Sequence, residues 1–295
     1  MGILIDRNTR VLIQGITGRE AATMSREMVA YGTKVVAGVT PGKGGQTVHG
    51  IPVYDSVREA VAAHEADAAV VSVPAQFAKD ATMEAIHNGI GLVVVLTERI
   101  PRQDVIEMIA FADRHGARIV GPNTAGIITV GECRLGYFGG DHPERSFTRG
   151  PVGIISRSGG MTTEIANLLT LNGIGQTTAI GLGGDVVVGT TYVDCLKLFE
   201  QDPQTKAVAL YCEPGGRKEE QAADFIRHHF SKPVVAFIAG KFVDRMPGAR
   251  FGHASVVVGP GSGSTQEKAV RFREAGVHVV ENYSDLAVKL KELLR

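Results

Sequence analysis

Short apolar runs alternate with segments of helical periodicity along most of the chain. In its first half, β-branched runs predict strands at 10–15, 33–39, 68–73, 91–98 and 117–123. Apolar residues recur at helical spacing in three segments between them, which are 56–64, 78–89 and 102–116. Strands that alternate with helices in this way predict a parallel, doubly wound α/β sheet.

A stretch rich in glycine, proline and charge, "GGDHPERSFTRG", interrupts the pattern at 139–150. Beyond it, strands are predicted at 151–156, 177–183, 206–213, 232–240, 254–259 and 277–283. Helical segments include 219–230, 265–276 and a closing helix at 284–295. Because 295 residues exceed what one core usually serves, we expect two α/β domains, 1–138 and 151–295, joined by a linker at 139–150.

The composition narrows the class of protein. No apolar run approaches the roughly 18 residues of a membrane span, and charges interrupt the N-terminal apolar residues where a signal peptide would be uninterrupted. We therefore expect a cytoplasmic protein without a membrane partner. Lys plus Arg and Asp plus Glu number 31 each, so no overall field attracts nucleic acid. The three cysteines are odd in number, far apart and without metal-ligand spacing, so neither a zinc site nor a disulfide framework is suggested.

The first domain begins with a turn suited to an anion. "VLIQGITGREA" predicts a strand that leads through Gly15 and Gly18 into a helix, where free N–H groups favour a phosphate. A turn without any ligand is the alternative. After the second predicted strand, Lys43 lies in a glycine-rich loop where a dinucleotide-binding protein would offer an acidic residue to the ribose. Lys43 thus favours a ligand with a phosphorylated ribose over one with an unphosphorylated ribose, which argues against a dehydrogenase. A solvated lysine is again the alternative.

The second domain contains a second turn of this kind and a histidine. Residues 156–160 lead from a strand into a helix, and Glu213 ends a buried strand, where it either faces a ligand crevice or caps the following segment. His253 follows a long loop, and it is predicted to pack, to bind a metal or to take part in chemistry. No second ligand lies nearby at metal-binding spacing. A carboxylate that orients an imidazole, beside a helix N-terminus, favours a phosphorylated histidine.

Blocks along the whole chain resemble one family, the alpha subunits of succinyl-CoA synthetase among the NDP-forming acyl-CoA synthetases. They occur in the same order and include "GITG", "YGTKVVAGVTPGKGG", "LTERIP", "VGIISRSG", "GLGGD", "FEQDPQT" and "GHA". The resemblance implies a Rossmann-like CoA-binding domain followed by a flavodoxin-like ligase domain that carries a phosphohistidine.

Site residues follow from the resemblance by motif match. His253 would be the phosphorylated residue and Glu213 its hydrogen-bonding partner. Contacts to coenzyme A would come from Thr17, Gly18, Arg19, Glu20, Lys43, Leu96, Thr97 and Glu98. The phosphate would be held by Ser156, Ser158, Gly159 and Gly160. ATP or GTP with Mg²⁺ would be bound mainly by a separate ATP-grasp beta subunit in an αβ or α2β2 complex, and this chain has no Walker loop of its own.

Three motifs depart from the family pattern. The family's "SRSGTLTYE" is "SRSGGMTTE" here, so Thr163 replaces a tyrosine that helps to hold the substrate. In addition, "GPNCPG" is "GPNTAG", and "GEIGG" is "CEPGG". Because the smaller side chain removes a contact and enlarges the pocket, we hypothesise an acid that is bulkier than succinate or differently substituted, with malate, citrate or another carboxylate open. A CoA-binding regulatory protein without turnover and a nicotinamide-dependent dehydrogenase are the alternatives from other classes.

Overall fold

The computed structural model describes residues 2–245, 252–256 and 263–295. Its contacts divide the chain into two compact units. The N-terminal unit comprises Leu4–Pro143 and a short later segment, Val187–Thr190. The C-terminal unit is made essentially of Glu144–Val186 and the described part of Thr191–Arg295. The change of unit at Pro143 falls within the segment 139–150, which remains a predicted linker.

The N-terminal unit is built on a sheet of the order β3-β4-β2-β1-β5-β6-β7. Its strands are β1 (Arg10–Gln14), β2 (Lys34–Val39), β3 (Thr47–Val48), β4 (Ile51–Tyr54), β5 (Ala68–Val71), β6 (Leu92–Val95) and β7 (Arg118–Val120). All neighbours pair in parallel except β3, which is antiparallel to β4. Without β3, the order corresponds to 3-2-1-4-5-6, that of a Rossmann fold.

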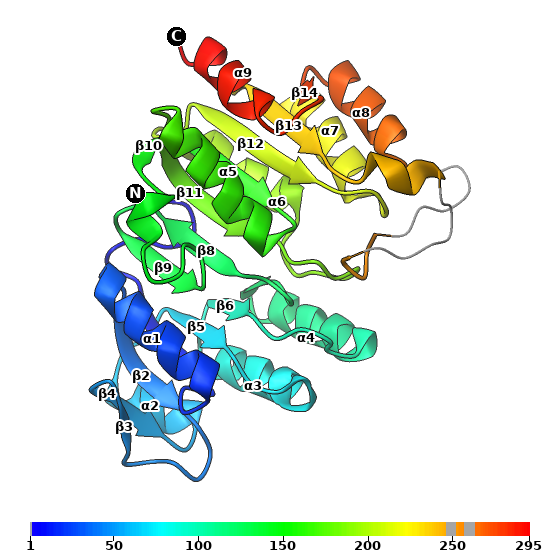
Figure 1. The fold of residues 1–295 in the computed structure, drawn as a ribbon. Helices are drawn as coiled ribbons and strands as arrows, with labels where there is room; N and C mark the ends of the chain where they lie inside the picture. The colour runs from blue at the N-terminus through cyan, green and yellow to red at the C-terminus, as the bar shows by residue number, and fades with distance from the viewer. Residues whose placement is uncertain (1, 246–251, 257–262) are drawn as a thin grey trace. The chain divides into compact units, whose positions relative to one another are not determined.

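Helices cover both faces of this sheet. They are α1 (Arg19–Tyr31), α2 (Val57–Ala63), α3 (Ala75–His87) and α4 (Arg102–Arg114). One apolar core joins the sheet to α2, α3 and α4, of which α3 and α4 lie side by side (Figure 1). The fully buried β6 residues Leu92–Val95 show why this strand reads as a continuous apolar run. An antiparallel hairpin, β8 (Gly126–Thr129) and β9 (Cys133–Gly136), follows β7 in the chain.

The C-terminal unit contains five parallel strands in the order β14-β13-β12-β10-β11. They are β10 (Arg149–Ser156), β11 (Gln176–Gly181), β12 (Ala207–Cys212), β13 (Val234–Ile238) and β14 (His278–Val280). Counted along the chain, this is the order 2-1-3-4-5 of a flavodoxin-like sheet. Because the order in which successive strands are added to the sheet reverses between the parallel neighbours β10 and β12, the loops after these two strands border the switch point.

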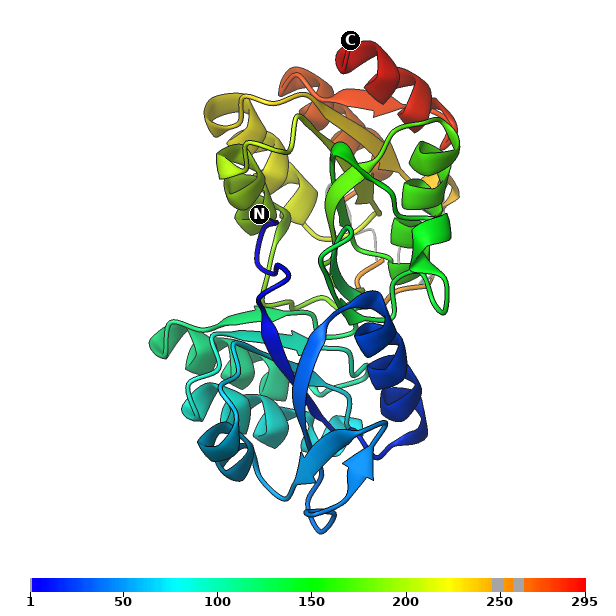
Figure 2. The same ribbon diagram turned by 90° about the vertical axis from the view of Figure 1, so that its left-hand side faces the viewer.

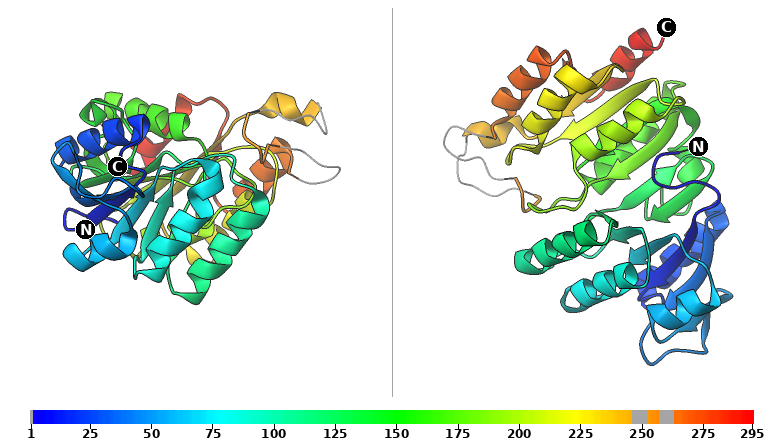
Figure 3. Two further views of the ribbon diagram at one scale, coloured as in Figure 1. Left: turned by 90° about the horizontal axis from the view of Figure 1, so that it is seen from below. Right: turned by 180° about the vertical axis from the view of Figure 1, so that it is seen from behind.

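The helices of this unit also form two layers. They are α5 (Gly159–Leu171), α6 (Tyr192–Gln201), α7 (Lys218–His229), α8 (Thr265–Glu274) and α9 (Asp285–Leu293), with short 3-10 segments η1 (Pro143–Arg145) and η2 (Lys241–Arg245). Contacts place α6, α7 and α8 in one row and pair α5 with α9. Figure 2 shows α7 and α5 on opposite sides of the sheet, and Figure 3 shows α7 beside α8 from behind.

The predicted fold class, a CoA-binding α/β domain followed by a ligase α/β domain, each on a mostly parallel sheet, is confirmed. Some details differ from the prediction. The run 254–259 was expected to form a strand, but its described part is a turn in which the Val256 N–H donates to the carbonyl of His253 at 3.0 Å. Residues 257–259 lie outside the described residues. In addition, β10 begins at Arg149, because pairing with Gln176 of β11 extends the strand into the polar stretch.

Candidate functional site

Two turns border the switch point of the N-terminal sheet, where β1 and β5 are neighbours. One turn leads from β1 into α1, and the other leads from β5 into α3. Gly15 joins them closely: its φ is +82°, and a Cβ there would lie 2.3 Å from the carbonyl oxygen of Ser72. Only glycine fits this position, since both the backbone angle and the space exclude a side chain. The two turns are thereby held together as one surface.

Two cavities open on this surface. One has a volume of about 920 Å³ and lies between the N-terminus of α1, the turn after β5 and the loop after β6. The other has a volume of about 780 Å³ and lies toward β2 and α3. They share Gly18, Ser72, Val73 and Pro74. Both volumes fall in the range of small-molecule sites, and both cavities lie where a ligand is expected in an open α/β sheet.

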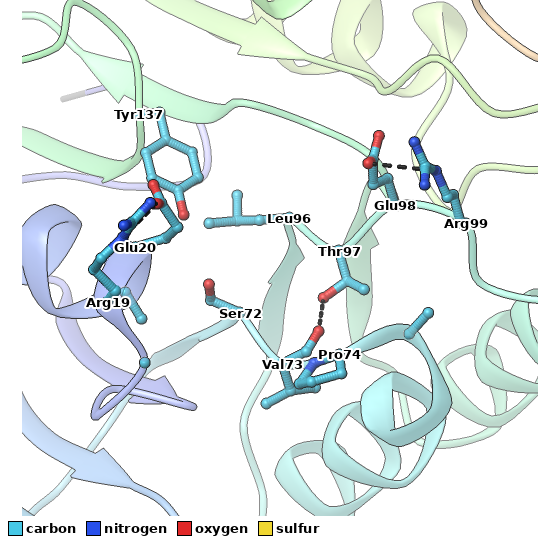
Figure 4. Close-up of a pocket in the computed structure, with 13 residues that line it drawn as sticks. Arg19, Glu20, Ser72, Val73, Pro74, Leu96, Thr97, Glu98, Arg99 and Tyr137 are labelled. Atoms are coloured by element: carbon cyan, nitrogen blue, oxygen red, sulfur yellow. Dashed lines mark hydrogen bonds and ion pairs between the residues drawn. The ribbon is translucent and has the colours of Figure 1, made fainter.

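The structure brings most of the predicted coenzyme A residues to these cavities. The first cavity is lined by Gly18, Arg19, Glu20, Leu96, Thr97 and Glu98, and the second by Thr17 and Gly18. Figure 4 shows the Thr97 hydroxyl donating to the carbonyl of Val73, a bond of 2.7 Å. Lys43 is exposed and lines neither cavity, although its backbone closes the loop after β2 through a bond to Thr40.

Sequence reasoning missed several residues that line the first cavity. Ser72, Val73 and Pro74 form the turn after β5, and Tyr137 contributes its ring from the segment after β9 (Figure 4). Burial raises the pKa of Tyr137, so its hydroxyl is a hydrogen-bond donor at neutral pH. The turn after β5 could have been found, since it borders the same switch point as the first turn. No sequence signal pointed to Tyr137, which comes from outside the βαβ pattern.

The turn after β10 begins helix α5 in the C-terminal unit. Ser158 is the N-cap residue, and its hydroxyl accepts from the N–H of Met161 at 3.4 Å. Gly159 and Gly160 are the first two helical residues, whose N–H groups have no partner within a helix. Ser156 ends β10 in a buried position and donates to the carbonyl of Ser158 at 2.8 Å. This arrangement presents the positive end of a helix dipole to an anion.

His253 and Glu213 form a hydrogen-bonded pair. Nδ1 of the imidazole lies 2.8 Å and 3.0 Å from the two carboxylate oxygens of Glu213, which directly follows β12. The side chains are 30% and 10% exposed. The hydrogen bond to Glu213 raises the pKa of His253, and burial of the ring opposes this rise. When the imidazole is neutral, the bond fixes its proton on Nδ1 and leaves the lone pair on Nε2.

The other side of the imidazole lies against the backbone of Gly184. A Cβ on Gly184 would be 2.4 Å from Cδ2 and 3.0 Å from Nε2 of His253. Gly184 belongs to the loop after β11, so the ring is held between this loop and Glu213. Among the described residues, Nε2 has no hydrogen-bond partner. The geometry therefore leaves one ring nitrogen available as a nucleophile.

A buried ionic network supports the pair. Arg157 directly follows β10, and its side chain is only 3% exposed. Its Nη1 donates to Glu219 at 3.0 Å, and its Nε lies 3.9 Å from a carboxylate oxygen of Glu213. Lys268 of α8 completes the network by donating to Glu219 at 2.8 Å and to Glu220 at 2.9 Å. Sequence reasoning missed Arg157, Glu219 and Lys268, because charged residues are usually exposed.

Three further sequence predictions concern the substrate residue Thr163, a metal site and a membrane span. Thr163 lies half-buried in the second turn of α5, five residues after the N-cap. Within the described ranges, no cluster of histidine, cysteine and acidic side chains has the arrangement of a metal site. None of the helices in these ranges combines the length and apolarity needed to cross a membrane.

Family models match both units. A CoA binding domain matches residues 6–99, and a CoA-ligase domain matches residues 155–281. Succinate–CoA ligase [ADP-forming] subunit alpha 1 from Archaeoglobus fulgidus is 47% identical over 100% of this chain and 99% of its own length. The corresponding alpha subunit from Staphylococcus epidermidis strain RP62A is 44% identical over 98% of this chain and 94% of its own length.

Solved structures agree with this relationship. ATP citrate lyase from Methanothrix soehngenii, in complex with citrate and coenzyme A, matches with a TM-score of 0.91 and 27% identity. The match covers 99% of this chain, which spans about half (50%) of the lyase. A dinucleotide-forming acetyl-coenzyme A synthetase 1 from Ca. Korarchaeum cryptofilum shares the fold, with a TM-score of 0.74 and 20% identity over 97% of this chain and 60% of its own.

Proposed function

The chain belongs to the family of succinate–CoA ligase alpha subunits, and from this premise we propose that it is the alpha subunit of an NDP-forming CoA ligase. It would form a thioester from a small di- or tricarboxylic acid, coenzyme A and a nucleoside triphosphate. The observation that carries the proposal is the His253–Glu213 pair, with Nδ1 2.8 Å from the carboxylate and Nε2 available. A CoA-binding protein without turnover needs no such pair, and a nicotinamide-dependent dehydrogenase does not need a phosphohistidine.

The first step is phosphorylation of His253. Neutral imidazole attacks the terminal phosphorus through Nε2, an N–P bond forms, and the P–O bond to the nucleoside diphosphate breaks. Glu213 accepts the hydrogen bond from Nδ1–H and stabilises the positive charge that the ring gains as Nε2 is phosphorylated. The N–H groups of Gly159 and Gly160 are suited to the negative oxygens of the phosphoryl group.

The next two steps activate and transfer the acyl group. A carboxylate oxygen of the acid attacks the phosphorus of phosphohistidine, which gives an acyl phosphate and returns neutral His253. The CoA thiol then loses its proton, its sulfur attacks the acyl carbon, and the C–O bond to phosphate breaks, so that thioester and inorganic phosphate are released. Each step depends mainly on positioning and on stabilisation of charge.

The cavities at the N-terminal switch point fit coenzyme A. Backbone N–H groups at the N-terminus of α1 suit a diphosphate, and Leu96, Val73 and Pro74 offer apolar contacts. We propose Thr17, Gly18, Arg19, Glu20, Leu96, Thr97 and Glu98 as contacts, with Lys43 at the edge. From its exposed loop, a long flexible lysine can reach a ribose phosphate without lining a cavity.

The nucleotide site is assigned to a partner. The chain contains no "GxxxxGK[ST]" motif, and an alpha subunit implies a beta subunit. We propose an ATP-grasp beta subunit that binds ATP or GTP with Mg²⁺, in a cytoplasmic αβ or α2β2 complex. The partner would bring the nucleotide to His253.

A second candidate substrate is supported by two observations. ATP citrate lyase, whose structure holds citrate and coenzyme A, matches 99% of this chain at 27% identity. Thr163, at the position of the family tyrosine, offers a small hydroxyl in the second turn of α5. We therefore propose that the preferred acid is larger or more oxygenated than succinate, with citrate and malate as the first acids to test.

The test is reconstitution with a candidate ATP-grasp beta subunit. The pair is incubated with labelled ATP or GTP, and acid-labile phosphate on His253 is located by mass spectrometry. Each acid of a panel is then added with and without CoA. Discharge by one acid, followed by thioester formation only with CoA, is the expected result. Absence of phosphate with an active beta subunit would contradict the relay, and succinate as best substrate would contradict the larger acid.

A further inference from the structure

Ser255 lies two residues beyond His253 in the same turn and connects three segments of the C-terminal unit. Its hydroxyl accepts a hydrogen bond from Nη2 of Arg157 and donates one to the carbonyl oxygen of Gly184 at 2.8 Å. Ser255 is only 8% exposed, so both bonds are shielded from water. Each partner belongs to a segment that also contacts the reacting pair, because Gly184 packs against the imidazole and Arg157 lies beside Glu213.

The two partners of Ser255 are themselves fixed. Arg157 is anchored through Glu219 to Lys268, whose side chain is fully buried between Glu219 and Glu220. This network links the loop after β10 to α7 and α8. A bond from Ser255 to Arg157 therefore ties the turn that carries His253 to a rigid part of the unit.

This connection matters because the turn has few other supports. Within the described part of the turn, 252–256, the backbone bond from Val256 to His253 is local and does not attach the turn to the sheet. Among the described residues, the hydrogen bonds that attach the turn to other segments are the bond between His253 and Glu213 and the two bonds of Ser255, while Val256 packs against Val243. The bond between His253 and Glu213 changes in strength during the reaction, because the ring gains positive charge when Nε2 acquires a phosphoryl group. The bonds of Ser255 involve no reacting atom and persist through the cycle.

We propose that Ser255, through Arg157 and Gly184, is a positioning residue that holds the His253 imidazole with Nδ1 on Glu213 and Nε2 free for the phosphoryl group. The inference rests on the proposed phosphohistidine relay. Ser255 touches no reacting atom, so its effect is on ring orientation. Loss of its hydroxyl lets the turn move and the ring rotate, and the neutral imidazole then populates both tautomers.

The experiment compares four full-length chains with the beta subunit: wild type, Ser255→Ala, Ser255→Thr and the matched control Ser264→Ala. Ser264 is the N-cap of α8, and its hydroxyl accepts from the N–H of Glu267 at 3.1 Å, so the control also removes one serine hydrogen bond from this unit. The first readout is the single-turnover rate of His253 phosphorylation. The second is the ¹⁵N chemical shift of Nδ1 and Nε2 at a pH where His253 is neutral, which reports the tautomer directly.

The expected result separates orientation from stability. Ser255→Ala should slow phosphorylation about 10- to 100-fold, the effect of misplacing a reacting group by about 1 Å. Its ¹⁵N shifts should indicate mixed tautomers, and coenzyme A affinity should stay unchanged. Ser255→Thr retains the hydroxyl and should recover most of the rate. Ser264→Ala should keep both the rate and the Nδ1–H tautomer.

Two results would overturn the inference. One is a wild-type rate and a single Nδ1–H tautomer in Ser255→Ala. The other is a loss of rate in both Ser255→Ala and Ser264→Ala that follows the fall in thermal midpoint of each variant. The effect of Ser255→Ala would then be one of stability. Failure of the wild-type pair to phosphorylate His253 at all would instead refute the proposed function.

Discussion

Nδ1 of His253 lies 2.8 Å from Oε2 of Glu213, at the end of a strand that borders the switch point of its sheet. Strand β12 fixes the position of the Glu213 carboxylate, and the carboxylate fixes the orientation of the His253 imidazole. This bond raises the pKa of His253, so a larger share of the imidazole is protonated near neutral pH than in a free histidine. Since only neutral imidazole attacks phosphorus, the phosphorylation rate of the proposed relay should rise with pH through that raised pKa.

Glu213→Gln tests this pairing. The amide keeps the size of the side chain but removes the charge, so the pKa of His253 should fall, and the pH at which phosphorylation reaches half its maximum should fall with it. The maximal rate should drop roughly 10- to 100-fold, the range seen when the partner that orients a histidine is removed. NMR titration of His253 and single-turnover assays across pH measure both effects. An unchanged titration would contradict the assignment of Glu213.

The same bond has a consequence for stability. Because the pKa of His253 is raised in the folded state, the stabilisation from Glu213 is fully present below the pKa of the unfolded chain and is lost as pH rises through the folded pKa. The difference in unfolding free energy between wild type and Glu213→Gln should shrink over that interval. Urea unfolding at several pH values measures it, and a difference that grows with pH would be inconsistent with this pairing.

Gly184→Ala should displace the His253 imidazole while the side chains of His253 and Glu213 stay the same. The new methyl group would lie 2.4 Å from Cδ2 of the imidazole, so the ring must move. Phosphorylation should fall at least about tenfold, since misplaced reacting groups lose rate steeply. The control is Gly91→Ala in the N-terminal unit, where no described atom lies within 4 Å of the added Cβ. Equal phosphorylation in both variants would show that the ring tolerates displacement.

Gly15→Ala should affect the other unit. Its Cβ would lie 2.3 Å from the Ser72 carbonyl, and φ is +82°, so the two turns that border the cavities must separate. We expect the affinity for coenzyme A, measured by calorimetry, to weaken at least about tenfold, by analogy with other displaced binding groups. Phosphorylation of His253 should remain, because that chemistry belongs to the C-terminal unit. Loss of both activities together would point to unfolding and not to the turn.

Lys268→Met tests the buried network. Lys268 and Glu219 are fully buried, and the pKa of Glu219 is lowered because Arg157 and Lys268 outweigh the effect of burial. Removing Lys268 takes away the cation that Glu219 and Glu220 share and leaves Arg157 as the remaining partner of Glu219, which should destabilise the protein by about 3 kcal/mol in urea unfolding. The matched control is Lys289→Met, whose ion pair with Glu292 is exposed and should contribute less than about 1 kcal/mol. Similar losses in both variants would contradict the importance of burial.

Lys218 offers a chemical probe of the same region. Burial, reinforced by the nearby positive charge of Arg157, lowers the pKa of Lys218 to about 8, while Glu219 and Asp185 act in the opposite direction. At pH 8 the Lys218 side chain should be a neutral amine in about half of the molecules. An amine-selective reagent should therefore modify Lys218 faster at pH 8 than the exposed Lys291, as mapped by peptide mass spectrometry. Slower modification of Lys218 at every pH would show that burial blocks the reagent.

Much of the fold could be predicted because apolar runs mark buried parallel strands. Residues 92–95 and 207–212 are fully buried in β6 and β12, and such strands read as continuous apolar segments. The hairpin of β8 and β9 was not predicted, since short antiparallel strands lack a helix between them to set the rhythm. The run 254–259 was wrongly predicted as a strand in its described part, where the turn is determined by side-chain bonds of His253 and Ser255.

Only part of the candidate site could be predicted from the sequence, and the reason is physical. His253 and Glu213 are chemical groups that sequence can reveal, and the structure brings them together. Arg157, Ser255 and Gly184 act through a buried contact or a missing Cβ, which depend on residues distant along the chain. Neither a buried arginine nor a close approach of backbone to ring leaves a local pattern in the sequence.

The segment Val187–Thr190 belongs to the N-terminal unit, although it follows Pro143 by more than forty residues. Within that unit, the Thr190 hydroxyl donates to the carbonyl of Ile119 at 2.6 Å, and the Gly189 N–H donates to Gly121 at 2.9 Å. A gene fragment that stops at Pro143 would lack these bonds at the border of β7. The two units are thus interleaved and not consecutive, and a recombination event that exchanges one of them as a single uninterrupted cassette would leave both halves incomplete.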